Sequence, residues 1–211
     1  MEIVIPMTTH SFWRADQVHQ VKDALSAIRA HFGNAINEAA GLTGVSTDLI
    51  TSFIFIESGG DVSALSASGA SGLMQVAPAT APGIIFLTKK AGKLNGMLKA
   101  KLVAMLGERI ANIEKQKYMD QKVSGRTSIS QAELMAPGFN ILIGAMMLAL
   151  LIPQHIENGK IRLDKVVTRY NRGYFHKPTG TTEQLLATSP RETQAYILKL
   201  VGVNSTLDIL T

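Results

Sequence analysis

The sequence predicts an all-α protein, from its composition, from the spacing of its apolar residues and from the lack of strand patterns. Hydrophobic residues make up 46% of the 211 residues but aromatic residues only 6%, so Ala, Leu, Ile and Met carry the apolar content. These residue types favour helices over sheets. Apolar residues recur at spacings of three and four, and no alternating pattern runs for more than a few residues. The length fits one large domain, with or without an embellishment.

The first third of the chain predicts three helices. An amphipathic helix over residues 14–32 and a shorter one over 35–40, ending near Gly41, come first. A third helix opens at the capping residues Ser46 and Asp48 and is apolar nearly all round, which predicts that it is buried. Glu57 lies at its C-terminal end.

The rest of the chain predicts further helices. An apolar stripe predicts one long helix over residues 94–120, with its lysines on the opposite face. Pro137-Gly138 precedes a very apolar helix that Pro153 ends. A short helix is expected over 163–170. Residues 189–192 read as a capping box, with Pro190 at the first helical position, that opens a last helix reaching Val201.

Neither the N-terminus nor the most apolar run of the chain indicates a membrane segment. The run at 141–152 is shorter than the roughly 20 residues that span a bilayer, so we expect a core helix and no transmembrane segment. Residues 1–13 lack a positively charged stretch and a long apolar run, so they do not resemble a secretory signal.

The positive charge of the chain is concentrated in residues 89–126. This segment holds ten Lys or Arg and three acidic residues, a net charge of +7, whereas the whole chain carries +5. One interpretation is a solvated helix face, because basic stripes are common on exposed helices. The other interpretation is a lobe that contacts an anionic cell-wall polymer or membrane surface. Nucleic acid is not expected as a partner, because the segment lacks interleaved aromatic residues and any nucleic-acid motif.

The composition also narrows the chemistry. The chain has no cysteine, so disulfides, thiolate catalysis and cysteine-bound metals are excluded. Its five histidines show no metal-ligand spacing, so a zinc site is not expected.

Glu57 is the residue best suited to catalysis. A carboxyl group at the negative end of a helix dipole, among apolar neighbours, has its pKa raised, as a general acid working near neutrality requires. A Gly/Ser-rich loop and a Gly-Leu-Met-Gln turn follow it, over residues 59–75.

Four sequence blocks carry a resemblance to a known family. They are Ile56-Glu57-Ser58-Gly59; Ala64-x-Ser66-x-x-Gly69-Ala70-x-Gly72-Leu73-Met74-Gln75; Asn140-Ile141-x-x-Gly144-Ala145-x-x-Leu148, continuing to Tyr170-Asn171-x-Gly173; and Glu192-Thr193-x-x-Tyr196. In this order they resemble the goose-lysozyme-like lytic transglycosylases (the soluble lytic transglycosylase family), which cut the glycan strands of peptidoglycan.

The resemblance implies an all-α, lysozyme-like domain with an inserted basic helical segment. Residues 1–30 would be a helical extension and 31–211 the transglycosylase domain, with the insertion at about 86–130. Peptidoglycan would be the substrate. Glu57 would be the sole acid/base, cleaving the bond between N-acetylmuramic acid and N-acetylglucosamine and leaving 1,6-anhydromuramoyl ends without metal or cofactor.

The other matched residues receive roles from the same resemblance. Ser66 and Gln75 would place polar groups near Glu57, and Met74 would wall the sugar site. Tyr170 would donate its hydroxyl to the Glu57 carboxyl or to the reacting sugar. Asn140 and Asn171 would hold the loop or contact sugar hydroxyls.

Four further residues in or beside these blocks are expected to have structural or secondary roles. Glu192 and Tyr196 are expected to pack or cap the last helix more than to touch substrate. Arg169 and Arg172, which flank Tyr170-Asn171, are expected to reach lactyl or peptide carboxylates of the substrate or else to be solvated.

Two alternatives stay open at this point. If Asp61 faced the cleft at about 6.5–9.5 Å from the acid, it could activate water, and the enzyme would be a hydrolytic muramidase. A cell-wall-binding or virion structural protein could also keep the fold without activity. For location, we expect a bacteriophage virion component or an endolysin released from the host cytoplasm, or else a chain from which an export signal was removed.

Overall fold

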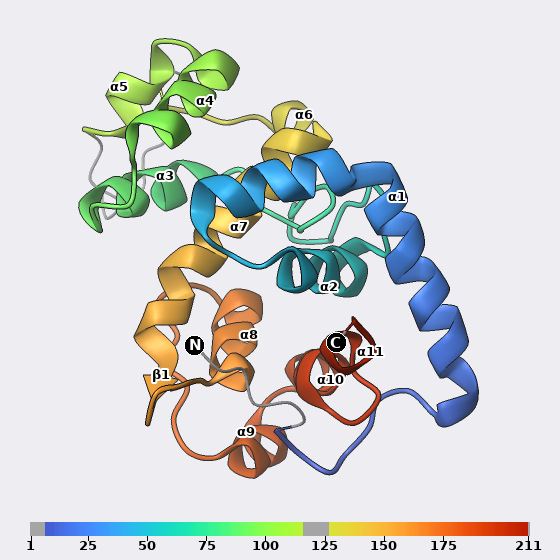
Figure 1. Ribbon diagram of the computed structural model, residues 1–211. Helices are drawn as coiled ribbons and strands as arrows, with labels where there is room; N and C mark the ends of the chain where they lie inside the picture. Colours follow the sequence, from blue (N-terminus) through green and yellow to red (C-terminus); the bar gives the residue numbers. More distant parts are fainter. Residues whose placement is uncertain (1–6, 116–126, 211) are drawn as a thin grey trace.

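The computed structural model describes residues 7–115 and 127–210, most of which lie in helices, so the all-α prediction is confirmed. In the described residues, two two-residue strands, β1 (Ile156–Glu157) and β2 (Lys160–Ile161), pair as an antiparallel hairpin. The helices are α1 Val18–Thr43, α2 Thr47–Ser58, α3 Ala81–Lys90, α4 Gly96–Leu106, α5 Arg109–Ile113, α6 Gln131–Leu134, α7 Pro137–Leu151, α8 Leu163–Arg172, α9 Thr182–Thr188, α10 Arg191–Val201 and α11 Thr206–Leu210, with the 3-10 turns η1 Ala15–Gln17 and η3 Ile152–His155. Figure 1 shows their arrangement.

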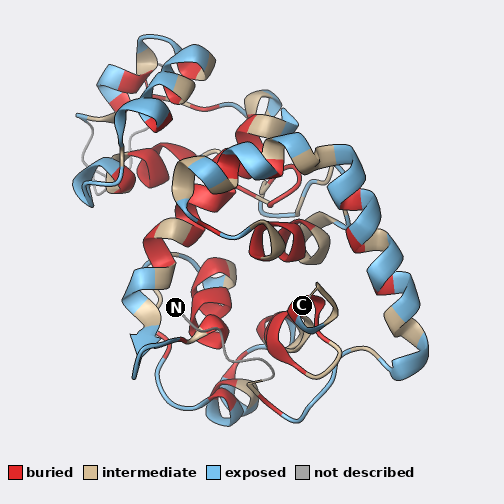
Figure 2. Ribbon diagram, in the orientation of Figure 1, coloured by how far each residue is buried: buried red, intermediate tan, exposed pale blue. Residues whose placement is uncertain are grey.

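Helix α7 forms the centre of the core. It packs against α1, α3, α8 and α2, and nearly all of its side chains are buried (Figure 2). By length and composition alone, Pro137–His155 could cross a membrane, but 67% of its most apolar stretch is buried inside the protein. This burial agrees with the expected core helix. Pro137 lies in its first turn, where a missing N–H costs nothing.

Helix α2 is buried as its sequence predicts. The Ser46 hydroxyl caps it by accepting a hydrogen bond from the Leu49 N–H at 3.2 Å. Its residues 49–54 are buried, and the helix packs against α1, α10, α11 and α7. Gly59 ends it in the left-handed conformation (φ 64°), so Glu57 occupies the last turn.

The first two predicted helices are one continuous helix. Helix α1 runs for 26 residues through Gly33 and Gly41 and ends at Gly44, whose φ is 74°. A buried stripe holds it against the core along its length: Val21, Leu25, Ile28, Ile36 and Ala39. The boundary predicted after residue 30 falls inside this helix, so no structural break marks it.

The predicted long helix over 94–120 is wrong, because it is broken within the described residues. Asn95 caps α4 by accepting a hydrogen bond from the Leu98 N–H at 2.9 Å. Gly107 ends α4 with φ 59° and ψ −141°, a conformation that favours glycine. The apolar stripe continues across the break with Ile110 and Ile113 buried in α5. Residues 116–120 of the predicted helix lie outside the described part of the chain.

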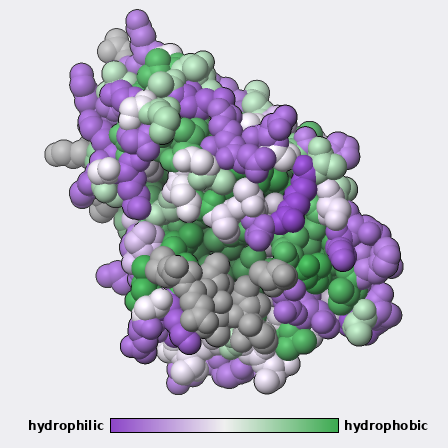
Figure 3. Space-filling model, viewed as in Figure 1, coloured by the Kyte–Doolittle hydropathy of each residue, from purple (hydrophilic) through white to green (hydrophobic). Residues whose placement is uncertain are grey.

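Helices α3, α4 and α5 form a lobe beside the main body (Figure 1, upper left). Hydrophilic residues cover much of this lobe on the face shown in Figure 3, whereas hydrophobic residues gather toward the middle of that face. The lobe contains most of the described residues of the predicted insertion, whereas residues 127–130 lead into α6.

Ion pairs use much of the positive charge of this lobe. Lys89 and Lys99 both contact Glu114, at 3.5 and 2.8 Å. Lys101 pairs with Glu38 of α1 at 2.7 Å, and Arg109 pairs with Glu133 of α6. A cluster of basic residues therefore serves partly to tie the lobe to the body. Binding of an anionic polymer or membrane surface stays a prediction, carried among the described cations by Lys90, Lys93 and Lys115; residues 117, 122 and 126 lie outside the described chain.

The capping box predicted for the last helix, over residues 189–192, is wrong. No capping box forms at Ser189, because Pro190 takes the N-cap position of α10 without a side-chain hydrogen bond, and the Ser189 carbonyl accepts from Gln194 instead. Boxes that the sequence analysis overlooked open α6, at Ser130 and Glu133, and α9. Helix α3, with Pro82 in its first turn, was also not predicted.

Residues 7–12, the N-terminal arm, lie across the end of α10. The Met7 N–H donates to the Val201 carbonyl at 3.0 Å, and the Val203 N–H donates to the His10 carbonyl at 2.9 Å. Phe12 lies 4.7 Å from the Lys199 ammonium group, measured to the ring centroid. The beginning and the end of the described chain therefore pack together.

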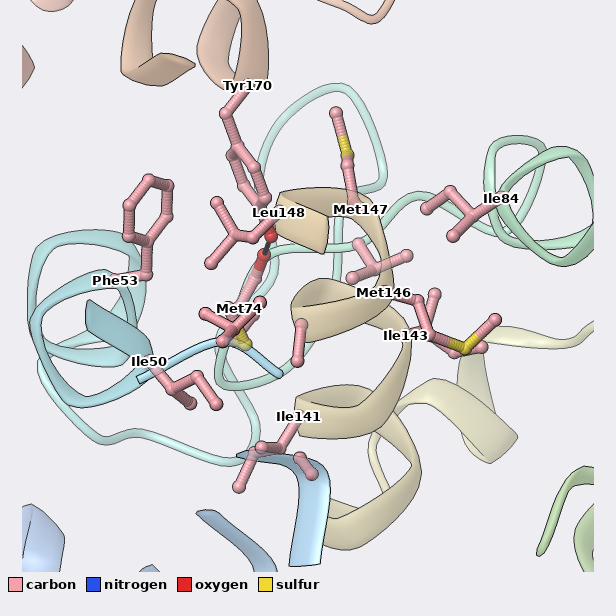
Figure 4. Close-up of a cluster of buried hydrophobic side chains, with 14 of the residues drawn as sticks. Ile50, Phe53, Met74, Ile84, Ile141, Ile143, Met146, Met147, Leu148 and Tyr170 are labelled. Atoms are coloured by element: carbon pink, nitrogen blue, oxygen red, sulfur yellow. Dashed lines mark hydrogen bonds between the residues drawn. The ribbon is translucent and has the colours of Figure 1, made fainter. Parts of the chain in front are cut away.

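Met74 joins the loop after α2 to the central helix. Its side chain is fully buried (Figure 4), and it lies directly on the backbone of Gly144 in α7. A Cβ atom at Gly144 would stand 2.5 Å from the Met74 sulfur, closer than real contacts allow.

We expect Gly144→Ala to destabilise the protein by about 1–3 kcal/mol, because Met74 would have to move. Gly138→Ala is the matched control in the same helix: a Cβ atom there has nothing within 4 Å. That control should leave stability unchanged or raise it by up to about 1 kcal/mol, since alanine favours helix. Urea unfolding of both variants measures the difference, and equal midpoints would contradict this packing.

Candidate active site

Glu57 lies on the wall of a cleft at the end of α2. The cleft has a volume of about 460 Å³. Its walls come from α2, from the loop after it, from the end of α8 and from α10: Ile56, Glu57, Ser66, Ser68, Ala70, Gln75, Tyr170, Asn171, Glu192, Ala195, Tyr196 and Lys199. A carboxyl group thus opens onto a space large enough for a small ligand or part of a chain.

The surroundings of Glu57 raise the pKa of its carboxyl group, so that the group is partly protonated near neutral pH. Burial raises its pKa from 4.5 to about 7. The hydrogen bond from Tyr196 and the charge of Lys199 lower the pKa, and the charge of Glu192 raises it, but burial outweighs them. This agrees with the raised pKa expected for Glu57. A pKa close to neutral pH suits a group that gives and then takes a proton.

Tyr196 is the residue that addresses Glu57 directly. Its hydroxyl donates to Glu57 Oε1 at 2.6 Å, and burial raises the pKa of that hydroxyl well above its ordinary value, so it keeps its proton. From the sequence, Tyr196 is expected to pack or cap the last helix more than to touch substrate, and this contact with Glu57 is not predicted. A signal was present, because a tyrosine on the buried stripe of a helix needs a partner for its hydroxyl.

Tyr170 has a different partner from the one expected. Its hydroxyl donates to the Met74 carbonyl at 2.9 Å (Figure 4), not to Glu57. Its ring packs edge-on against Phe53 of α2, with centroids 4.8 Å apart. Tyr170 therefore fixes the loop after α2, while it also lines the cleft.

Ser66 and Gln75 both line the cleft, and both also hold the loop between them. The Ser66 hydroxyl accepts from the Ala70 N–H at 2.9 Å. The Gln75 amide donates to the carbonyls of Ala64 and Gly72 at 3.1 and 2.9 Å. Gln75 has a φ of 45°, unusual for a residue other than glycine, which indicates a tightly determined loop.

Asn140 and Met74 do not reach the cleft. Both side chains are fully buried. Asn140 accepts from the Met74 N–H and donates to the carbonyls of Ser71 and Leu134, each at 2.7 Å. Of the two roles expected for Asn140, the structure shows the loop-holding one; contact with sugar hydroxyls would need an exposed amide. The sugar wall expected of Met74 is likewise not seen, since its side chain packs into the core.

Asn171 lines the cleft and connects α8 to α10. Its amide donates to Glu192 Oε1 at 3.2 Å, and its carbonyl oxygen accepts from the Thr193 hydroxyl at 2.6 Å. The bond from Asn171 holds the Glu192 carboxylate on the wall of the cleft.

Asp61 does not line this cleft. It is exposed, and Oδ1 accepts from the Ser63 N–H and hydroxyl at 2.8 and 2.7 Å. These hydrogen bonds lower the pKa of Asp61. The second carboxylate that shares the cleft with Glu57 is Glu192, so the water-activating role considered for Asp61 has no support in the geometry.

Comparison with protein families matches residues 34–99 to the transglycosylase SLT domain. This match covers less than half of the chain and supports a lytic transglycosylase family. Members of the family are peptidoglycan lytic transglycosylases with a lysozyme-like domain, and the mostly helical fold of this chain is consistent with it. A search of curated proteins finds no match.

The SLT match covers α2 and the whole loop that builds one side of the cleft, with Glu57, Ser66, Met74 and Gln75. It also extends to residue 99, inside the segment predicted as an insertion. The blocks around Asn140, Tyr170-Asn171 and Glu192 lie outside the matched range. Hydrogen bonds in the structure connect these blocks to the matched residues. Asn140 and Tyr170 each form a hydrogen bond with the Met74 backbone, and Tyr196 donates one to Glu57.

Substitution of Tyr196 and of Tyr170 by Phe should have different effects on the pH dependence of peptidoglycan solubilisation. Tyr196→Phe removes a bond that favours the Glu57 carboxylate, so the pKa of Glu57 rises and the high-pH limb should move up by about one pH unit. Tyr170→Phe should leave that limb in place and lower stability by about 1–2 kcal/mol, because a buried carbonyl loses its donor. A shifted limb in Tyr170→Phe alone would restore the role first expected of Tyr170.

Stability should reveal the burial of Glu57 independently of activity. The pKa of Glu57 in the folded protein, about 7, lies above its ordinary value of 4.5. The free energy of unfolding is therefore highest below pH 4.5, where Glu57 is protonated in both states, and it falls as the pH rises through 7. Glu57→Gln cannot ionise and escapes this loss. It should be more stable than the native protein by roughly 3 kcal/mol at pH 8 and equal at pH 4. Denaturant unfolding at the two pH values measures this, and a constant difference would contradict the raised pKa.

Proposed function

We propose that Glu57 acts as the single acid/base that cleaves the bond between N-acetylmuramic acid and N-acetylglucosamine and leaves 1,6-anhydromuramoyl ends. The observation that carries the proposal is a carboxyl group with a pKa of about 7 on the wall of an open cleft. One group with that pKa can serve both halves of the reaction, because it is partly protonated at neutral pH.

In the first half, protonated Glu57 gives its proton to the glycosidic oxygen as the C1–O bond breaks. Oε1 accepts the Tyr196 hydrogen bond, so we place the proton on Oε2. Tyr196 holds the carboxyl group in one orientation, and its bond strengthens as the carboxylate forms. Lys199, on the same cleft wall, adds a positive charge that favours the carboxylate.

In the second half, the Glu57 carboxylate removes the proton of the muramoyl C6 hydroxyl. The C6 oxygen then bonds to C1 of the same sugar, so one bond forms for the one that broke and no water enters. Glu57 ends protonated, as it began. The acetamido group of the sugar stabilises the positive charge at C1, a substrate-assisted route that needs no second carboxylate.

Hydrolysis by a muramidase mechanism is the second candidate, and Glu192 is the observation that favours it. This carboxylate lines the same cleft and raises the pKa of Glu57 by its charge. A hydrolytic enzyme would use it to activate water. Its Oε1 is engaged by Asn171, which fits a structural role instead. The products decide: anhydro ends are one water lighter than reducing ends.

Glu57→Gln should lower the release of anhydro products from purified sacculi by about 10³-fold, since a general acid/base contributes 10²–10⁴. Asp61→Asn is the matched control, because it removes a neighbouring carboxylate that does not line the cleft. It should leave both rate and product mass unchanged. Liquid chromatography with mass spectrometry identifies the ends.

Three results would contradict the proposal. Reducing ends alone would indicate hydrolysis, and their loss in Glu192→Gln would assign the water-activating group. Undiminished release by Glu57→Gln would remove Glu57 from the chemistry. No release by the native protein, with binding to sacculi retained, would indicate a wall-binding protein that keeps the fold.

A further inference from the structure

A second cavity adjoins the Glu57 cleft on the side of α8. It has a volume of about 430 Å³ and shares four lining residues with the cleft, so the two form one groove: Ala70, Gln75, Tyr170 and Asn171. Its other walls come from the segment leading into α3, from Met147 of α7 and from residues 172–176, which follow Asn171.

The two cavities differ in charge. The Glu57 cleft is lined by two carboxyl groups and one lysine. The second cavity is lined by Arg172 and His176 and by no acidic residue. The contact of Arg172 is with His176, at 3.5 Å between Nη1 and Nε2, and none of the ion pairs among the described residues includes Arg172. Its positive charge is therefore not neutralised by a carboxylate of the described chain.

A buried arginine fixes the wall that carries these groups. Arg169 is only 7% exposed. Its Nε donates to the Tyr174 carbonyl at 2.6 Å, and its guanidinium group lies 4.7 Å from the centre of the Tyr174 ring. Gln154 donates to the Tyr174 hydroxyl at 3.1 Å and accepts from Arg169. Arg169 thus supports the cavity wall through Tyr174 and does not itself line the cavity.

The turn between Arg172 and His176 is closed by its own backbone. Gly173 has a φ of 98°, in the region that favours glycine, and its carbonyl accepts from the His176 N–H at 3.0 Å. Burial and the charges of Arg172 and Arg169 lower the pKa of His176. At neutral pH His176 is neutral and can accept or donate one hydrogen bond, while Arg172 carries the charge.

We propose that this cavity binds a carboxylate carried by the muramoyl residue next to the cleft, with Arg172 as its partner and His176 beside it. Arginine presents two parallel N–H groups that match a carboxylate. Two sources share this chemistry in peptidoglycan: the lactyl carboxylate of a muramoyl residue without peptide, and the carboxylates of the stem peptide. The inference rests on the proposed function for the register of the glycan strand in the groove.

Binding to the Glu57→Gln protein tests the site without turnover. The ligands are peptide-bearing glycan strands, strands stripped of peptide, which expose the lactyl carboxylate, and chitooligosaccharides, which carry no carboxylate. Arg172→Gln should weaken binding of carboxylate-bearing strands about tenfold and leave chitooligosaccharide binding unchanged. Arg172→Lys should recover part of the loss, because it keeps the charge but not the paired N–H groups.

Lys177→Gln is the matched control. Lys177 is an exposed cation one residue beyond His176 and does not line the cavity. It should bind all three ligands as the parent does. A loss confined to peptide-bearing strands assigns the stem peptide, and a loss on stripped strands assigns the lactyl group. Equal losses on chitooligosaccharides, or no loss with any ligand, would overturn the proposal.

The two proposals can fail separately. Release of anhydro products by the native protein together with unchanged binding in Arg172→Gln would remove the carboxylate site and leave the reaction intact. A native protein that forms no anhydro ends, with binding still dependent on Arg172, would remove the reaction and keep the site.

Discussion

One buried amide connects the active-site loop to the core. Asn140 comes from the central helix α7, and its three hydrogen bonds at 2.7 Å reach two points of the loop and the end of α6. Gly72 must be glycine there, since a Cβ atom would stand 2.6 Å from the Asn140 amide. Ser66, Gln75 and the Tyr170 contact all depend on the loop that this amide holds. A buried polar group that is fully bonded specifies one arrangement, whereas a partly bonded one would not.

Burial of Glu57 links function to a cost in stability. The same enclosure that brings its pKa to about 7 disfavours the ionised form of the folded protein. Tyr196 and Lys199 limit this cost, because each favours the carboxylate. Both come from α10, so this one helix tunes the acid, while α2 and the loop position it. Strain or charge kept at a site in this way is a common source of the conflict between activity and stability.

The sequence was informative where local signals were strong and silent where distant packing decides. The Ser46 cap and the apolar runs predicted α2 and α7, and the position of Glu57 predicted its raised pKa. Glycine shows the limit: Gly33 lies inside α1 without ending it, whereas Gly107 ends α4 with a positive φ. Nothing local separates the two cases. Likewise, Tyr170 and Tyr196 are both buried helix tyrosines, and only the packing of α8 and α10 decides which hydroxyl reaches Glu57.

The distance along the chain between Glu57 and Tyr196 has a consequence for folding. The two residues are 139 positions apart, and the N-terminal arm also pairs with residues after Leu200. Contacts between distant segments form late, because a long loop must close first. A ribosome releases α2 and its loop long before α10. The acid therefore acquires its tuning partner only after α10 has been synthesised and has packed against α2.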